Sequence, residues 1–146
     1  MDKITKEHRS WNMKRIKSKD TKPELFIRRE LWHRGIRYRK NDSSIFGHPD
    51  IFISKYRCAV FVHGCFWHRH TGCKYAYIPK SRIEFWQKKF QSNIDRDRIV
   101  KETLQNQNVR IIVVWECTAE KAMKDSSMID DIFEEIVYGI DSYKEF

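Results

Sequence analysis

The chain has 146 residues, a length that favours one compact domain with a single core. Hydrophobic residues make up 40% and charged residues 34%, and no apolar run approaches the roughly 18 residues that span a bilayer. The N-terminal residues 1–6 are polar and lack the apolar stretch of a signal peptide. We therefore expect a soluble cytoplasmic protein and exclude a membrane protein.

The charge of the chain points to its partner. The formal net charge is +9 and the pI is about 9.5. Excess positive charge of this size favours a polyanion, because neutralising phosphates and releasing their counterions provides affinity without sequence preference. The alternative is a basic protein that has no nucleic-acid partner.

A basic segment opens the chain. Residues 8–20 are rich in Lys and Arg, and Ser10 can cap a short helix that has Met13 and Ile16 on related faces. The segment has few apolar groups to bury, so we predict a DNA-binding arm over residues 1–20. A solvated terminal helix is the alternative.

Hydrophobic periodicity and turn residues predict the remaining elements. In chain order they are a helix at 21–35, strands at 36–39, 50–53 and 56–62, a helix at 81–107, a strand at 109–115 and a helix at 126–138. The two-residue spacing at Ser54 and Lys55 predicts a hairpin, and Ser81 is the expected cap of the long helix. The order of elements predicts a small mixed sheet flanked by helices, of the α/β or α+β class, within one domain at 21–146.

Three residues form a C-x4-H-x2-C cluster after the strand at 56–62. Cys65, His70 and Cys73 carry thiolate and imidazole groups, which are good Zn²⁺ ligands, and tight spacing lets them reach one tetrahedral centre. Cys117, at the end of the strand at 109–115, is the leading candidate for a fourth ligand, and a closed set of four indicates a structural metal. Alternatively, Cys73 and Cys117 are ordinary buried thiols. Cys58 is interpreted as a core residue.

Two further histidines and one aspartate are candidates for catalysis. His63 and His68 follow the same strand and are free to move protons or to bind a phosphate oxygen. Asp50 opens the hairpin, where its carboxylate could hold Mg²⁺ to activate water and neutralise a phosphate. The alternative for Asp50 is a turn that simply begins a strand.

Three aromatic side chains are candidates for DNA contact. Phe66 and Trp67 are adjacent in the His- and Cys-rich segment, and Trp86 lies early in the long helix. Side chains of this size can insert between base steps and kink a duplex. Core packing is the alternative for Trp86, whereas Phe66 and Trp67 are expected to be exposed.

Seven segments together resemble the very-short-patch repair endonucleases. They cover about residues 8 to 120 and comprise residues 9–13, Thr21-x-x-Glu24, and residues 47–51, 56–68, 84–86, 93–97 and 113–117. The HGCFWH motif at 63–68 is highly specific. The resemblance implies a restriction-endonuclease-like, three-layer core with a central mixed sheet, and an enzyme that nicks one DNA strand 5′ to the thymine of a T·G mismatch.

The resemblance also implies roles for individual residues. Asp50 and the main-chain carbonyl of Val62 would bind catalytic Mg²⁺, and His68 would act as the general base or position the water, supported by His63 and Glu24. Val62 stands where the family has a threonine, but a backbone ligand tolerates this change.

Structural zinc and the DNA contacts follow from the same resemblance. The zinc ligands would be Cys65, His70, Cys73 and Cys117, and the DNA-binding residues would be Phe66, Trp67 and Trp86 as intercalating side chains, Lys89 and Asn93 at the mismatched pair, and Met13 and Ile16 near the minor groove. The expected partners are double-stranded DNA carrying a T·G mismatch and other mismatch-repair proteins, for a monomer associated with the nucleoid. The alternatives are a nicking or restriction endonuclease acting on matched DNA, and a zinc-stabilised DNA-binding module without catalysis.

Overall fold

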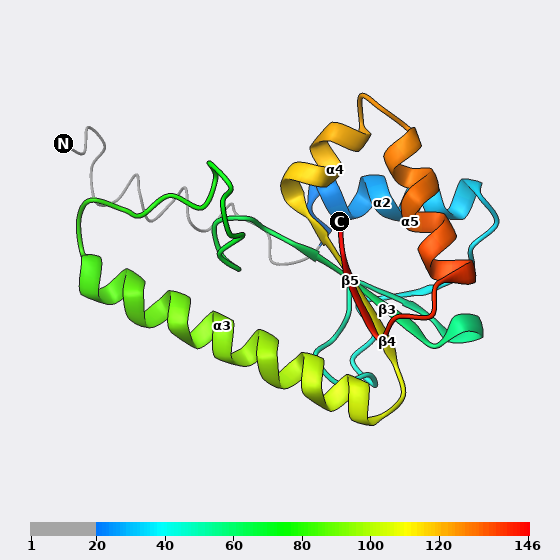
Figure 1. Ribbon diagram of the computed structural model, residues 1–146, viewed down its shortest axis with the longest axis horizontal. Coiled ribbons are helices and arrows are strands. Elements are labelled where there is room, and N and C mark those ends of the chain that lie inside the picture. Colours follow the sequence, from blue (N-terminus) through cyan, green and yellow to red (C-terminus); the bar gives the residue numbers. More distant parts are fainter. Residues whose placement is uncertain (1–19) are drawn as a thin grey trace.

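One five-stranded sheet organises the chain, and the computed structural model describes residues 20–146 (Figure 1). Residues 1–19 of the predicted arm, with Met13 and Ile16, lie outside the described residues. The strands are β1 (Arg39–Lys40), β2 (Ile51–Ile53), β3 (Cys58–His63), β4 (Arg110–Trp115) and β5 (Tyr143–Glu145). The helical elements are α2 (Lys22–His33), the 3-10 turn η1 (Ser54–Tyr56), α3 (Ile83–Asn106), α4 (Glu116–Ala122) and α5 (Ser127–Tyr138).

The strands lie in the sheet in the same order as in the chain, from β1 at one edge to β5 at the other. β2 is antiparallel to both β1 and β3, whereas β4 is parallel to both β3 and β5. The central pair, β3 and β4, is in register from Cys58 beside Arg110 to His63 beside Trp115. The sheet is therefore mixed, which confirms the predicted α/β class.

Helices cover both faces of the sheet and produce three layers (Figure 1). α2, α4 and α5 pack on one face, where Leu31, Ile112 and Ile132 belong to one buried cluster. α3 covers the other face, where Leu104 and Ile111 belong to a second buried cluster. Because both faces of β3 and β4 are covered, these strands are almost continuously apolar.

Local sequence signals explain the first helix. The hydroxyl of Thr21 accepts the backbone N–H of Glu24 at 3.4 Å, and a proline occupies the first turn, as the sequence predicts. Ile27 and Leu31, one turn apart, are fully buried against the sheet. The helix begins where Glu24 can reach the loop that precedes β2.

The predicted hairpin of β2 and β3 forms, but its connection is longer than two residues. After the 3-10 turn η1, Arg57 adopts the left-handed conformation with φ of 46°. Its guanidinium donates to the carbonyls of Gln107 at 2.9 Å and Asn108 at 3.4 Å, just after α3. This contact between distant segments fixes the turn, and local sequence could not indicate it.

Other boundaries also differ from the prediction. The strand expected at 36–39 is reduced to β1, because the short β2 offers it only two pairing partners. Ser81 does not cap α3: Arg82 precedes the helix with φ of 55°, and its guanidinium lies 4.3 Å from the ring centre of Phe85. α4 and β5 were not predicted. Over the described residues, no helix is both long and apolar enough to cross a membrane.

Gly47 holds the loop before β2 against α3, and its replacement is expected to destabilise the protein. It adopts φ of +81°, and an added Cβ would lie 2.6 Å from a methyl carbon of Val100. Gly47→Ala should lower the free energy of unfolding by about 2–4 kcal/mol, because backbone strain and overpacking add. Gly35→Ala is the matched control: its φ is +89° and nothing lies within 4 Å of the added Cβ, so it should cost only about 1 kcal/mol. If urea unfolding showed the same loss of unfolding free energy for both variants, the contact between residue 47 and Val100 would not be the cause.

Candidate functional site

A cavity of about 1070 Å³ opens at the carboxyl end of β3, between the start of α2 and the middle of α3. The predicted site residues that line it are Glu24, Asp50, Val62, His63, Phe66, Trp67, His68, Lys89 and Asn93. These residues come from four separate segments of the sequence. Trp86 and the predicted zinc ligands lie outside the lining.

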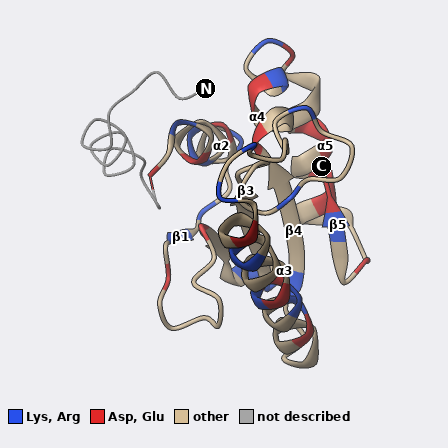
Figure 2. Cartoon of the chain, turned by 90° about the vertical axis from the view of Figure 1, so that its left-hand side faces the viewer, with Lys and Arg blue, Asp and Glu red and all other residues tan. Residues whose placement is uncertain are grey.

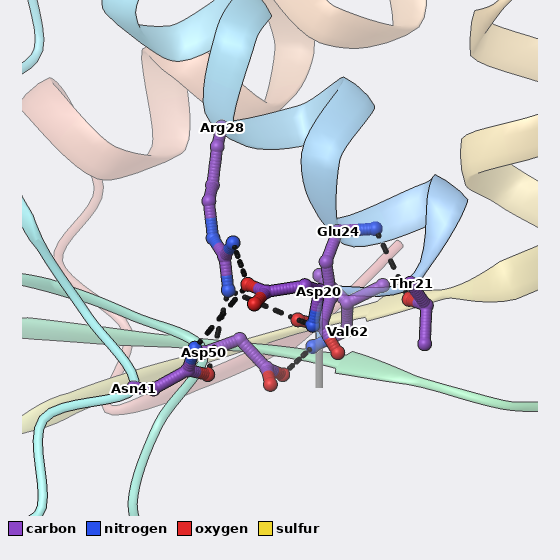
Figure 3. A network of polar contacts seen from close by, with 7 residues as sticks. All are labelled: Asp20, Thr21, Glu24, Arg28, Asn41, Asp50 and Val62. Carbon is purple, nitrogen blue, oxygen red and sulfur yellow. Dashed lines mark hydrogen bonds and ion pairs between the residues drawn. The ribbon is translucent and has the colours of Figure 1, made fainter. Parts of the chain in front are cut away.

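Asp50 and Glu24 form an acidic pair on one side of the cavity (Figure 3). Oδ2 of Asp50 accepts the backbone N–H of Val62 at 2.6 Å, which fixes the carboxylate beside the end of β3. Burial, and then the negative charge of Glu24, raise the pKa of Asp50 to about 7. Two carboxyl groups placed so closely are suited to a divalent cation, which relieves their repulsion.

His63 and His68 form a stacked histidine pair that also lines the cavity. Their ring centres lie 3.8 Å apart with an interplanar angle of 5°, and Nδ1 of His68 lies 2.7 Å from Oδ2 of Asp97. Burial, and then the charge of His68, lower the pKa of His63 to about 3, so His63 is neutral at physiological pH. With Asp97 accepting from Nδ1–H, Nε2 of His68 is left as a proton acceptor.

Four aromatic side chains, Phe66, Trp67, Trp86 and Phe90, form an aromatic cluster between the loop after β3 and α3. The ring of Phe66 lies 5.4 Å from that of Trp86 and 5.2 Å from that of Phe90. The three residues predicted to intercalate are half-buried, because they pack on one another. The exposure expected for Phe66 and Trp67 is therefore only partial.

α3 presents polar and basic residues to the cavity. Lys89, Asn93 and Asp97 are spaced by four positions, which places them on one face of the helix. Nδ2 of Asn93 donates to the carbonyl oxygen of Trp67 at 3.0 Å and so ties the helix to the loop. Figure 2 shows basic residues along α3, and three more of them, Arg96, Arg98 and Lys101, also line the cavity.

Cys65, His70, Cys73 and Cys117 form a cysteine–histidine cluster that could hold a metal ion. Their ligand atoms all lie within 4.8 Å of one another. Nδ1 of His70 lies 3.6 Å from Sγ of Cys65 and 3.4 Å from Sγ of Cys117. The sequence predicts Cys117 at the end of a strand. It lies instead in the first turn of α4, where its N–H donates to Sγ of Cys65 at 3.4 Å. Cys58 is buried in the core, away from this cluster, as predicted.

Trp115 lies between the cysteine–histidine cluster and the histidine pair. The ring of His70 stacks on it at 4.2 Å, and the ring of His63 meets its edge at 5.5 Å. Trp115 is the last residue of β4 and lies beside His63 in the sheet register. One indole ring thus contacts a residue of each cluster and sets their spacing.

Sequence reasoning missed two residues of the site. Asp97 was part of a recognised segment but was given no role; the four-residue spacing from Lys89 and Asn93 could have indicated it. Arg28 was not predicted at all, although it lies one turn after Glu24 and pairs with it at 3.0 Å. Its place in the site depends on burial, which a single sequence does not show.

Comparison with known proteins places this arrangement in a family. Residues 1–74 match the family model described as DNA mismatch endonuclease Vsr. The type II nicking enzyme V.NmeAIP of Neisseria meningitidis serogroup A is 47% identical over 116 residues, which cover 80% of this chain and 82% of that protein. The DNA mismatch endonuclease Vsr of Escherichia coli K12 is 41% identical, covering 80% and 72%. This chain belongs to the Vsr family.

The family membership confirms the resemblance seen in the sequence and makes the chain an endonuclease that acts on DNA. A more distant relative supports it along most of the chain. The type II nicking enzyme V.NaeI of Lentzea aerocolonigenes is 32% identical over 142 residues, which cover 94% of this chain and 83% of that protein.

Asp50 of this Vsr-family protein should reduce stability when no divalent cation is bound. Its pKa in the folded state, about 7, lies above the ordinary 3.8, so ionising it costs folding free energy as pH rises from about 4 to 7. Asp50→Asn should therefore raise the free energy of unfolding at pH 8 in Mg²⁺-free buffer by about 1–3 kcal/mol.

The increase in unfolding free energy caused by Asp50→Asn should be smaller at pH 5.5 than at pH 8. Urea unfolding of wild type and variant at the two pH values measures this difference. A divalent cation held by the Asp50 carboxylate would appear as a stabilisation of the wild type alone when Mg²⁺ is added, because a ligand stabilises the state that binds it. A gain of equal size at both pH values would show that the carboxylate of Asp50 is not the source of the effect.

Proposed function

We propose that this protein is a mismatch-repair endonuclease that nicks one DNA strand 5′ to the thymine of a T·G mismatch, by Mg²⁺-dependent hydrolysis of the phosphodiester. The observation that carries the proposal is that one cavity is lined by both the acidic pair and the histidine pair. Family membership supports it, since the family description and the Escherichia coli relative both name a DNA mismatch endonuclease. The mixed sheet between two helical layers is compatible with a restriction-endonuclease-like core.

Asp50 and the carbonyl of Val62 would hold the Mg²⁺ ion. The N–H and C=O of one strand residue point to the same edge, so the Val62 carbonyl faces the side from which Asp50 accepts the Val62 N–H. Hard oxygen donors suit Mg²⁺. Burial and the negative charge of Glu24 raise the pKa of Asp50, and a bound cation would favour its ionised form. When bound, the cation supplies an acidic water and offsets negative charge on the phosphate.

His68 is the proposed general base, and Asp97 is the residue that orients it. The 2.7 Å contact between Nδ1 and Oδ2 sets the ring with Nε2 free to take a proton from the attacking water. The carboxylate of Asp97 also stabilises the imidazolium that results. His63, neutral and stacked on His68, holds the ring plane without adding a second positive charge.

Zinc is the metal proposed for the cysteine–histidine cluster. In a tetrahedral zinc centre with ordinary bond lengths, sulfur and nitrogen ligands lie about 3.5 Å apart. The measured 3.4 and 3.6 Å separations fit this arrangement. Four protein ligands leave no open position, so zinc here would join the loop after β3 to the start of α4 and would not act in hydrolysis.

DNA contacts are proposed for the aromatic cluster and for the face of α3 in the cavity. Phe66, Trp67 and Trp86 would insert beside the mismatch, with Lys89 and Asn93 facing the mismatched pair. The basic arm at residues 1–20 would add phosphate contacts, since it carries seven Lys and Arg against three acidic residues.

A second candidate function is nicking of matched DNA at a specific sequence. It is favoured by the names of several relatives, which are described as type II nicking enzymes. The two functions share the same active site and differ in the base pair that is accepted.

Strand-resolved cleavage of labelled duplexes distinguishes the two functions. We expect a nick immediately 5′ to the mismatched thymine of a T·G duplex in Mg²⁺ buffer, and none in the T·A counterpart or without Mg²⁺. Asp50→Ala should abolish the nick and leave the zinc content unchanged, because Asp50 lies outside the cysteine–histidine cluster. Equal nicking of both duplexes would support the matched-DNA function instead.

Zinc content tests the structural metal. The purified protein should contain about one zinc ion per chain, and Cys117→Ala should lose most of it and lower the melting temperature by roughly 10 °C or more. Cys58→Ala is the matched control: Cys58 is a buried thiol outside the cluster, so this variant should keep its zinc. A full zinc ion in Cys117→Ala would remove Cys117 from the ligand set.

A further inference from the structure

Arg28 carries a buried positive charge directly behind the acidic pair (Figure 3). Arg28 and Glu24 are 4% and 2% exposed and are the buried charged residues of the described chain. Nη2 of Arg28 donates to Oε2 of Glu24 at 3.0 Å, and Nη1 donates to Oδ1 of Asp20 at 2.6 Å. Burying charges costs free energy even when they are paired, so this arrangement calls for an explanation beyond stability.

The two oxygens of the Glu24 carboxylate have different surroundings. Oε2 accepts from both Arg28 and the backbone N–H of Asp20, the latter at 2.8 Å. Among the described residues, no N–H or O–H donor is bonded to Oε1. Glu24 is nevertheless within hydrogen-bonding reach of Asp50 when one of the two carboxyl groups is protonated. One oxygen is thus fixed and the other is left for the cavity.

Arg28 does not line the cavity, whereas Glu24 and Asp50 do. Its guanidinium therefore makes no contact with the cavity; it holds the Glu24 carboxylate, and its charge lowers the pKa of Asp50. It offsets the repulsion between the two carboxylates from behind and leaves the cavity itself free. The planar fork also suits this geometry, since Nη2 additionally lies 3.4 Å from Oδ1 of Asn41; a lysine ammonium could not reach all three partners in the same way.

We propose that Arg28 is a positioning residue of the endonuclease: it fixes the Glu24 carboxylate beside Asp50 in the orientation that the cleavage step requires. The inference rests on the proposed hydrolysis at the acidic pair. It assigns no contact between Arg28 and DNA, so its loss should affect the chemical step and not the binding of the duplex.

A double-mutant cycle between Arg28 and Glu24 tests the proposal, with single-turnover nicking and DNA affinity measured separately. Arg28→Met should slow nicking about tenfold to a hundredfold, the cost of a misplaced group, while the dissociation constant of the duplex changes by less than about twofold. Within a Glu24→Gln background, Arg28→Met should slow nicking by less than about twofold further, because residues that act through one another are not additive.

Arg34→Met, at the C-cap of the same helix, is the matched control. Arg34 pairs with Glu30 at 3.0 Å with the same four-residue spacing, outside the cavity. This variant should nick at the wild-type rate. Arg28→Lys keeps the positive charge but lacks the planar guanidinium with its several donors, so this variant should nick more slowly than the wild type. If Arg28→Met does not fold, the cycle is run with Arg28→Lys.

Two results would overturn the proposal. One is a folded Arg28 variant that nicks at the wild-type rate. The other is a slowing of nicking by Arg28→Met that is as large in the Glu24→Gln background as in the wild type, which would show that Arg28 acts independently of Glu24. The comparison uses whichever duplex the wild type cleaves. Wild-type nicking of T·A and T·G duplexes alike would therefore refute the mismatch specificity and leave this test intact.

Discussion

Six residues of β3 lie beside six residues of β4, and this parallel pairing decides where the site forms. Parallel strands end at the same edge of a sheet, so the segment after β3 and the start of α4 meet there. Cys65 and His70 follow β3, and Cys117 follows β4. The pairing therefore brings together side chains of the cysteine–histidine cluster that are some 50 positions apart in sequence. The antiparallel register of β2 and β3 places Val62 where Asp50 can accept its N–H.

The two clusters at this edge differ in chemistry although they are adjacent. The cysteine–histidine cluster gathers three thiols and an imidazole, whereas the acidic pair and the histidine pair line an open cavity with carboxylate and imidazole groups. Trp115 contacts a histidine of each cluster and keeps them apart. Rigid placement of this kind matters in a hydrolase, because reacting groups must be held within a fraction of an ångström. The proposed structural zinc would thus serve catalysis indirectly, by fixing the loop that carries His68.

Sequence patterns predicted the features that depend on local chemistry. The apolar run of β4, the cap of α2 at Thr21 and the spacing of three cluster residues all follow from short segments. Features that depend on contacts between distant segments were not predicted. α4 begins directly after β4 without a side-chain cap, so Cys117 was expected in the wrong element. Arg28 reads as one more surface residue of an amphipathic helix until its burial is known. Asp97 gains its role only because α3 brings its carboxylate to the ring of His68.

The position of the catalytic metal tests the account most directly. A crystal structure of the protein with a nicked T·G duplex and Mn²⁺ in place of Mg²⁺, with anomalous data at the manganese and zinc edges, would locate both ions. We expect manganese between Asp50 and the Val62 carbonyl, next to the scissile phosphate, and zinc within the cysteine–histidine cluster. Manganese on the stacked histidines, or no zinc in the cluster, would contradict the division of this sheet edge into one catalytic and one structural centre.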